Sequence, residues 1–229
     1  MWNIIKAIGC IIKSNKKKIV IVGAGLHAGP VLELVQLTNE YDIIGYIDKS
    51  PQLQNQKCRD LPVLGDDSLF PKLKDLGIEA AVLGMGFEYS KARLKIFEDL
   101  TNLGLSFPNF IHPQAIISNS VKLGQGIVAM AGAVANPNCN IKDLCVLNTN
   151  CNIDHDCNLG KNVFISPGVS LGGKVTVNDH TFIGIGSSII DRTIIGNNSY
   201  IGAGSVVVED IPNNVLVYGN PAKVIKKYE

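Results

Sequence analysis

Residues 147–165 read LNTNCNIDHDCNLGKNVFI, and in this stretch an aliphatic residue returns at every sixth position. The spacing continues in both directions and places sixteen apolar residues in one column: Ile117, Leu123, Ala129, Ala135, Ile141, Leu147, Ile153, Leu159, Ile165, Leu171, Val177, Ile183, Ile189, Ile195, Ile201 and Val207. A second column, two residues earlier, is small or β-branched from Ala115 to Ser205. Residues two apart on a strand point to the same side, so both columns can face one interior.

A period of six indicates a short strand, a turn and another short strand. Three such strands close a coil of about 18 residues, and successive coils stack at the inter-strand spacing of about 4.8 Å. One coil cannot bury its own apolar face, so stability accrues as coils stack. The spacing predicts a coiled parallel β-solenoid over residues 108–212, followed by a C-terminal tail of residues 213–229.

Four of the six cysteines, Cys139, Cys145, Cys151 and Cys157, lie in the small inward column. Buried cysteine packs as a small hydrophobe, whereas a zinc site favours paired ligands such as C-x2-C, which this segment lacks. We therefore expect these thiols to be core residues and predict no metal site. With no secretory signal in the sequence, the cysteines are expected to be reduced, which predicts a cytoplasmic protein.

Residues 16–107 show a different pattern, in which strand-like and helix-like segments alternate. The expected strands are Lys18–Val22, Tyr41–Ile47 and Glu79–Leu83, and the expected helices follow Gly29 and cover Asp67–Leu76 and Lys91–Leu103. This alternation predicts a small Rossmann-like parallel α/β domain. The turn Gly23-x-Gly25-x-x-Ala28 opens a helix, where backbone N–H groups can approach a phosphate. There are two alternatives to a phosphate-binding turn in a nucleotide-sugar site. The turn could pack the helix without binding a ligand, or it could belong to a dehydrogenase.

Composition narrows the function classes. Lys and Arg total 21 against 20 Asp and Glu among 229 residues, so no basic field indicates a nucleic-acid partner. No apolar run approaches the roughly 20 residues of a membrane-spanning helix. Residues 1–15 nevertheless place apolar side chains on one helical face ahead of a lysine cluster. Three alternatives remain for this segment: weak contact of residues 1–18 with the inner face of the membrane, packing on another subunit, or disorder.

The two halves together resemble the NeuD/PglD family of sugar O- and N-acetyltransferases. The resemblance rests on these segments, which follow the family's order: IVIVGAGLHA, IIGYID, LPVLGDD, IHPQAII, NTNCNIDHDCNLG, IGAGSVVVEDIP and GNPAKVIKK. It implies that the solenoid is a left-handed β-helix that forms a homotrimer, with acetyl-CoA in the groove between adjacent subunits. It also implies that the α/β domain holds a nucleotide-sugar substrate.

The resemblance implies roles for individual residues. His155 is expected to be the general base, oriented by Asp156 with Asp154 as a second partner, and the Gly173 N–H is expected to bind the thioester oxygen of acetyl-CoA. A turn glycine that needs positive φ is the alternative explanation for Gly173. Other expected contacts are divided between substrate and cofactor as follows: Gly23, Gly25, His27, Asp48, Gly84 and Asn148 for the substrate, and Gly173 with Lys223 for CoA.

Three positions depart from the family pattern or lack an explanation. Many family members carry a second His nine residues after the base, where this chain has Phe164. Relatives often have two acids after the second strand, where this chain has Asp48-Lys49. His180 occupies a turn that more often holds Asn or Ser, and the sequence offers no reason for it.

The preferred function is an acetyl-CoA-dependent N-acetyltransferase that acts on a UDP- or dTDP-linked 4-amino-4,6-dideoxy sugar. The alternatives are a sialic-acid O-acetyltransferase and, more remotely, a non-catalytic nucleotide-binding solenoid. A γ-type carbonic anhydrase shares the solenoid but needs three His ligands for zinc, and two of the four His residues, His27 and His112, precede the repeat columns, which begin at Ala115.

Overall fold

The structure is a computed structural model that describes residues 15–228, and the chain divides after Pro108 into two compact units. We call these the N-terminal unit and the C-terminal unit. The amphipathic extension predicted for residues 1–15, with its membrane and subunit alternatives, lies outside the described residues except for Asn15. Within residues 15–228, no helix has the length and apolar character needed to cross a bilayer.

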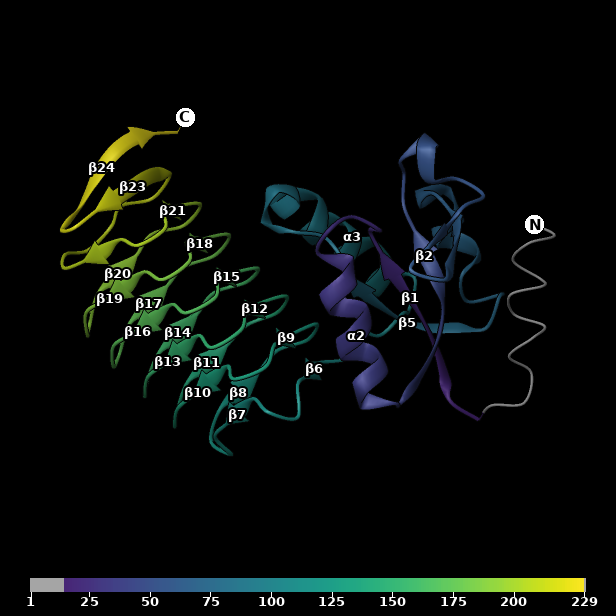
Figure 1. The fold of residues 1–229 in the computed structure, drawn as a ribbon, viewed down its shortest axis with the longest axis horizontal. Helices are drawn as coiled ribbons and strands as arrows, with labels where there is room; N and C mark the ends of the chain where they lie inside the picture. Colours follow the sequence, from purple (N-terminus) through teal and green to yellow (C-terminus); the bar gives the residue numbers. More distant parts are fainter. Residues whose placement is uncertain (1–14, 229) are drawn as a thin grey trace. The chain divides into compact units, whose positions relative to one another are not determined.

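The N-terminal unit is built on a five-stranded sheet with the order β3-β4-β2-β1-β5 (Figure 1). Its elements are β1 Lys17–Val22, α2 Ala28–Thr38, β2 Tyr41–Ile47, η1 Pro51–Leu53, β3 Lys57–Cys58, β4 Leu61–Gly65, η2 Asp67–Lys72, β5 Ile78–Leu83, η3 Phe87–Tyr89 and α3 Ser90–Asn102. All neighbouring strands pair in parallel except the edge strand β3, which is antiparallel to β4. The central strand β1 is fully apolar and buried from Ile19 onward, as parallel sheets covered on both faces require.

The helix predicted over Asp67–Leu76 is shorter than expected. Only the 3-10 helix η2 forms, and turns follow it. Pro71 lies inside η2 and has no N–H to contribute to an α-helical ladder. Asp66 caps the start by accepting a hydrogen bond from the Ser68 N–H at 2.9 Å.

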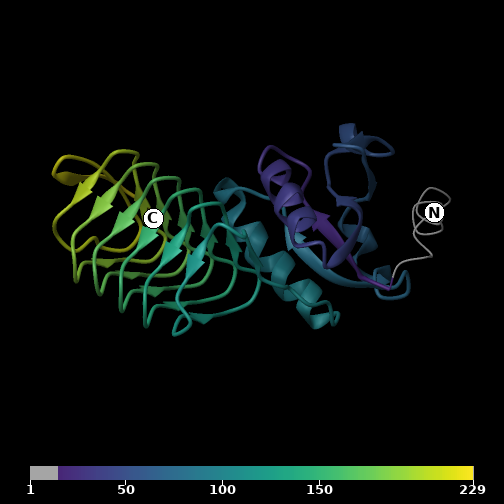
Figure 2. The ribbon, with the colours of Figure 1, turned by 60° about the horizontal axis from the view of Figure 1, so that its bottom comes forward.

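The C-terminal unit is a parallel β-helix of three sheets, and Figures 1 and 2 show its two-residue strands stacked in rows. The first sheet contains β6 Phe110–Ile111, β9 Val128–Ala129, β12 Val146–Leu147, β15 Phe164–Ile165, β18 Phe182–Ile183, β21 Tyr200–Ile201, β23 Val215–Gly219 and β24 Ala222–Lys227. The second contains β7 Ile116–Ile117, β10 Val134–Ala135, β13 Asn152–Ile153, β16 Ser170–Leu171, β19 Ser188–Ile189 and β22 Val206–Val207. The third contains β8 Lys122–Leu123, β11 Asn140–Ile141, β14 Asn158–Leu159, β17 Thr176–Val177 and β20 Ile194–Ile195. The predicted fold class, an α/β unit followed by a hexapeptide-repeat β-helix, is confirmed.

The inward columns form the core of the β-helix, and the small column also donates hydrogen bonds. The Sγ atoms of Cys139 and Cys145 each lie 3.0 Å from the carbonyl oxygen fifteen residues later. The hydroxyls of Thr181 and Ser187 make the same bond at 2.7 and 3.0 Å. The column therefore accepts Cys, Ser and Thr alike, because each is small and can donate to this carbonyl. Among residues 15–228, no group of three or more His, Cys, Asp or Glu side chains is arranged to hold a metal ion.

Most turns of the β-helix contain one residue with a left-handed backbone. Fourteen positions six apart have φ between 52° and 69°: Gly126, Gly132, Asn138, Leu144, Asn150, Asp156, Asn162, Gly168, Lys174, His180, Gly186, Arg192, Asn198 and Gly204. Glycine reaches this region freely, and Asn, Asp and His are enriched there among other residues. The position of His180 is thereby explained as a turn position, and its Nδ1 lies 3.3 Å from the Asn162 amide one coil below.

Candidate active site

His155 lies at the corner between β13 and β14, as the repeat register predicts. Its side chain is 52% exposed, so the imidazole projects away from the core. The His155 backbone N–H donates to Asp154 Oδ1 at 2.8 Å. Asp154 thus fixes the corner backbone.

Asp156 pairs with the imidazole of His155. His155 Nδ1 and Asp156 Oδ2 are 2.8 Å apart, and the left-handed backbone of Asp156 (φ 59°) belongs to the turn pattern described above. This hydrogen bond, followed by the charge of Asp154, raises the pKa of His155 above its ordinary value of 6.5. Since an ionised carboxylate only accepts, the neutral ring carries its proton on Nδ1 and leaves the Nε2 lone pair available as a base.

Gly173 lies one coil above His155 and leaves room for the imidazole. A Cβ atom at Gly173 would lie 2.9 Å from both Cε1 and Nε2 of His155, closer than side-chain atoms normally approach. Gly173 does not have a positive φ, so the turn explanation for this glycine is wrong and the positive φ belongs to Lys174. The Gly173 N–H makes no hydrogen bond within the described part of the chain, and it remains a donor beside the imidazole.

The ionisation of His155 gives a testable pH dependence. A base with a raised pKa loses activity as the pH falls through a value above 6.5, so the acidic limb of kcat/KM should lie above 6.5. Asp156→Asn removes the carboxylate, so we expect the acidic limb to move to lower pH and kcat at the plateau to fall by about tenfold or more, since loss of the orienting carboxylate of a triad costs up to about 10⁴. A pH–rate profile of both proteins measures this, and an unchanged acidic limb would contradict the pairing.

Asn148 and Lys223 lie elsewhere in the C-terminal unit. Asn148 is at the preceding corner of the same coil, where its amide donates to the Ile165 carbonyl oxygen at 2.8 Å. Lys223 is exposed on β24, opposite Tyr218 in the β23–β24 hairpin, and its ammonium is free to meet an anion. Phe164, in place of a second His, stacks on Phe182 with ring centroids 5.7 Å apart.

In the N-terminal unit, the glycine-rich turn packs against the loop after β5. A Cβ atom at Gly23 (φ 95°) would lie 2.5 Å from Met85 Cγ, and one at Gly84 would lie 2.6 Å from the Gly23 carbonyl oxygen. These two glycines are therefore required by packing. Gly25 differs, because a Cβ atom there would meet no atom within 4 Å. Its absent side chain leaves open space in front of the turn.

Asp48 and Arg59 hold the glycine-rich turn in place. Asp48 Oδ2 accepts from the Ala24 N–H and Oδ1 accepts from the Ser50 N–H, both at 2.8 Å. Arg59, in the β3–β4 turn, donates to the carbonyl oxygens of Ala24 at 3.2 Å and Gly25 at 2.9 Å. Sequence reasoning missed Arg59, because only the hairpin brings it to residues more than thirty positions earlier. Its guanidinium leaves a positive charge beside the turn.

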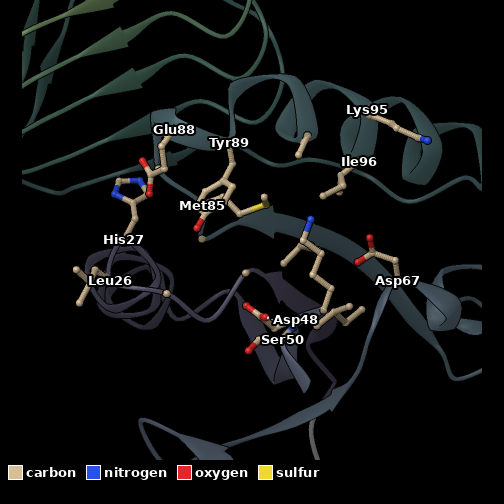
Figure 3. A pocket seen from close by; sticks show the side chains of 18 of the residues that line it. Leu26, His27, Asp48, Ser50, Asp67, Met85, Glu88, Tyr89, Lys95 and Ile96 are labelled. Atoms are coloured by element: carbon tan, nitrogen blue, oxygen red, sulfur yellow. Dashed lines mark hydrogen bonds between the residues drawn. The ribbon is translucent and has the colours of Figure 1, made fainter. Parts of the chain in front are cut away.

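A cavity of about 740 Å³ opens in front of this turn. Five of the six predicted substrate-binding residues line it: Gly23, Gly25, His27, Asp48 and Gly84. The sixth, Asn148, is in the other unit. Figure 3 shows the charged and aromatic side chains that sequence reasoning did not identify, among them Asp67, Glu88, Tyr89 and Lys95. Burial, followed by the charge of Arg93, lowers the pKa of His27 to about 4, so His27 is neutral at pH 7. The cavity has the size of a small-molecule pocket.

Two family models match the chain, one in each unit. Residues 18–100 match the family model described as PglD N-terminal domain, and residues 174–208 match the model described as Bacterial transferase hexapeptide (six repeats). A protein of known structure, PerB from Caulobacter crescentus in complex with CoA and GDP-perosamine, is 34% identical. The match has a TM-score of 0.85 and covers 93% of this chain and 99% of PerB.

Further matches include the acetyltransferase domain of PglB from Neisseria gonorrhoeae in complex with acetyl coenzyme A. It is 34% identical, with a TM-score of 0.84, and the match covers 92% of this chain and all of that domain. WeeI from Acinetobacter baumannii, 24% identical with a TM-score of 0.79, shares the fold. The protein YJL218W from Saccharomyces cerevisiae is 67% identical over 30 residues, which are only 15% of its length.

Proposed function

The chain belongs to the hexapeptide-repeat sugar acetyltransferases that carry a PglD N-terminal domain, and from this membership we propose that it acetylates the amine of a nucleotide-linked amino sugar. It is an acetyltransferase that uses acetyl-CoA. The acceptor we propose is a UDP- or dTDP-linked 4-amino-4,6-dideoxy sugar. The observation that carries the proposal is the His155–Asp156 pair, with the Cε1–Nε2 edge of the ring facing Gly173.

The reaction we propose is direct attack without an acetyl-enzyme. The sugar amine attacks the thioester carbonyl carbon, and a C–N bond forms while His155 Nε2 takes the amine proton. The Gly173 N–H donates to the carbonyl oxygen as negative charge develops on it. The C–S bond then breaks, and the CoA thiolate leaves and takes its proton from the imidazolium. Asp156 stabilises that imidazolium, and no step is assigned to a metal ion.

The cavity of the N-terminal unit supports a nucleotide-linked acceptor over a free sugar. Gly25 leaves open space at a helix start, where phosphate oxygens can approach backbone N–H groups. The Arg59 guanidinium adds positive charge at the same turn. PerB, 34% identical, is described in complex with GDP-perosamine. A free sialic acid would leave this cavity without an assigned ligand.

We further propose that the chain works as a homotrimer with acetyl-CoA between subunits. The outward side of the first sheet carries an aromatic stack, in which the rings of Phe182 and Tyr200 are 4.4 Å apart. The equivalent outward positions of the third sheet are polar at Asn140 and Asn158 and apolar at Ile194. An apolar sheet face of this kind supports subunit packing. Lys223 is the proposed contact to a CoA phosphate.

Free-CoA release with a panel of acceptors tests the proposed function. The panel contains UDP- and dTDP-linked 4-amino-4,6-dideoxy sugars, GDP-perosamine, CMP-sialic acid and free sialic acid. We expect turnover with an amino-sugar nucleotide. Turnover with sialic acid alone would make the protein an O-acetyltransferase, and the absence of turnover with every acceptor would favour a non-catalytic solenoid.

Two glycines of the N-terminal unit provide a matched pair of variants. Gly25→Ala introduces a methyl group into open space at a permitted φ, so we expect an unchanged Tm but a KM for the nucleotide sugar raised by about tenfold. Gly84→Ala forces a Cβ atom against the Gly23 carbonyl oxygen, so we expect a lower Tm. Thermal unfolding and initial rates measure both. A normal KM for Gly25→Ala would show that no phosphate approaches the turn there.

A further inference from the structure

The segment Asn136-Pro137-Asn138 lies one coil below Asp154-His155-Asp156, and hydrogen bonds join the two segments. Asn138 Nδ2 donates to Asp156 Oδ1 at 3.2 Å, and Asn136 Nδ2 donates to Asp154 Oδ1 at 3.2 Å. Between them, the Asp156 backbone N–H donates to the Pro137 carbonyl oxygen at 3.0 Å. Each carboxylate beside His155 therefore has its own amide in the coil below.

With the hydrogen bond from Asn138, both carboxylate oxygens of Asp156 have a partner. One carboxylate oxygen accepts from Asn138, and the other lies 2.8 Å from His155 Nδ1. The Asp156 side chain is 38% exposed, so without the amide its carboxylate could rotate in solvent away from the imidazole. The bond from His155, and after it the bond from Asn138, lowers the pKa of Asp156, which stays ionised.

Asn138 is itself held in position. Its backbone is left-handed, with φ of 65°, and its N–H donates to Ser120 Oγ at 3.0 Å. Asn138 is exposed, but its amide projects from a turn whose backbone is held by this hydrogen bond. A chain of contacts runs from Ser120 through Asn138 and Asp156 to the ring of His155.

We propose that Asn138 is a positioning residue, which acts on His155 through Asp156. The inference rests on the proposed role of His155 as the general base. Asn138 orients the carboxylate, and the oriented carboxylate holds the ring with Nε2 toward Gly173. Sequence spacing places Asn138 beneath Asp156 but does not distinguish this role from that of a turn residue. Asn162, for example, makes a similar bond to His180 at a corner with no role in the proposed reaction.

A double-mutant cycle between Asn138→Gly and Asp156→Asn tests the inference. Glycine keeps the left-handed turn and removes only the amide. We expect Asn138→Gly to lower kcat by about tenfold, since a misplaced catalytic group loses rate steeply, while KM for both substrates stays within about twofold. In the Asp156→Asn background the same change should have no further effect, because Asn138 acts only through the carboxylate.

The control is Asn198→Gly, the same substitution at the equivalent turn position of another corner, with φ of 52°. It should leave kcat unchanged, and both glycine variants should have similar Tm values. An intact kcat in Asn138→Gly would overturn the inference, and so would an equal loss of kcat when the change is made in the wild-type protein and in Asp156→Asn. In either case, a loss of kcat in Asp156→Asn alone would still support the proposed function. A normal kcat and an unshifted pH profile in Asp156→Asn would instead overturn the His155–Asp156 mechanism itself.

Discussion

Replacement of His155 by alanine should lower kcat by roughly 10²–10⁴, the usual contribution of a positioned general base. The side chain is half exposed at a turn and contributes little to the core, so the fold should be retained. Nε2 is the ring nitrogen not occupied by Asp156, and its loss removes from that corner the one imidazole positioned to take the amine proton. Initial rates of CoA release at saturating substrates measure the effect.

His180→Asn is the matched control for this variant. His180 also lies at a turn of the β-helix, and asparagine suits its left-handed backbone, φ 57°. It should keep both kcat and Tm. A loss of less than about threefold in His155→Ala, measured with protein of normal Tm, would reject the general-base role.

Gly173→Ala should lower kcat by roughly 10²-fold, because displacement of a catalytic group by about 1 Å costs that much. The added methyl group would lie 2.9 Å from Cε1 and Nε2 of His155 and must push the exposed ring away. The same methyl group would stand beside the N–H that we propose as the oxyanion donor. Because the ring is half exposed and can turn toward solvent, the expected cost in stability is small.

Gly168→Asn controls for glycine replacement elsewhere in the β-helix. Gly168 has φ of 67°, and a Cβ atom there would meet nothing within 4 Å. Asparagine tolerates this backbone, so activity and Tm should be retained. If Gly173→Ala kept wild-type kcat, neither the clearance around the imidazole nor the orientation of Nε2 toward Gly173 would matter for the reaction.

The sequence was sufficient to predict the β-helix, because its core repeats with a short period. Ile141, Leu147 and Ile153 occupy successive inward positions six residues apart, and all three are fully buried. The same register predicted that His155 lies at a corner and that Cys139 is buried. The parallel α/β unit followed from alternating strand and helix patterns, although Pro71 shortened the element predicted around it.

Contacts between segments that the six-residue period does not relate were beyond prediction from the sequence. Arg59 meets the glycine-rich turn only because the β3–β4 hairpin is placed beside β2, and no local pattern indicates this. The 18-residue coil already predicts that Gly173 stacks on His155, but the room that Gly173 leaves for the imidazole became visible only from the position of the ring. The structure also gave Asp48 a second role, since its carboxylate fixes the Ala24 and Ser50 backbone before any ligand is considered.

The chemical identity of the product tests the central proposal most directly. The protein is incubated with acetyl-CoA and a UDP-linked 4-amino-4,6-dideoxy sugar, and the product is examined by mass spectrometry before and after mild alkali. The proposal predicts a sugar nucleotide that has gained one acetyl group and keeps it in alkali, as an amide does. An acetyl group that is lost in alkali, as an ester is, would contradict it.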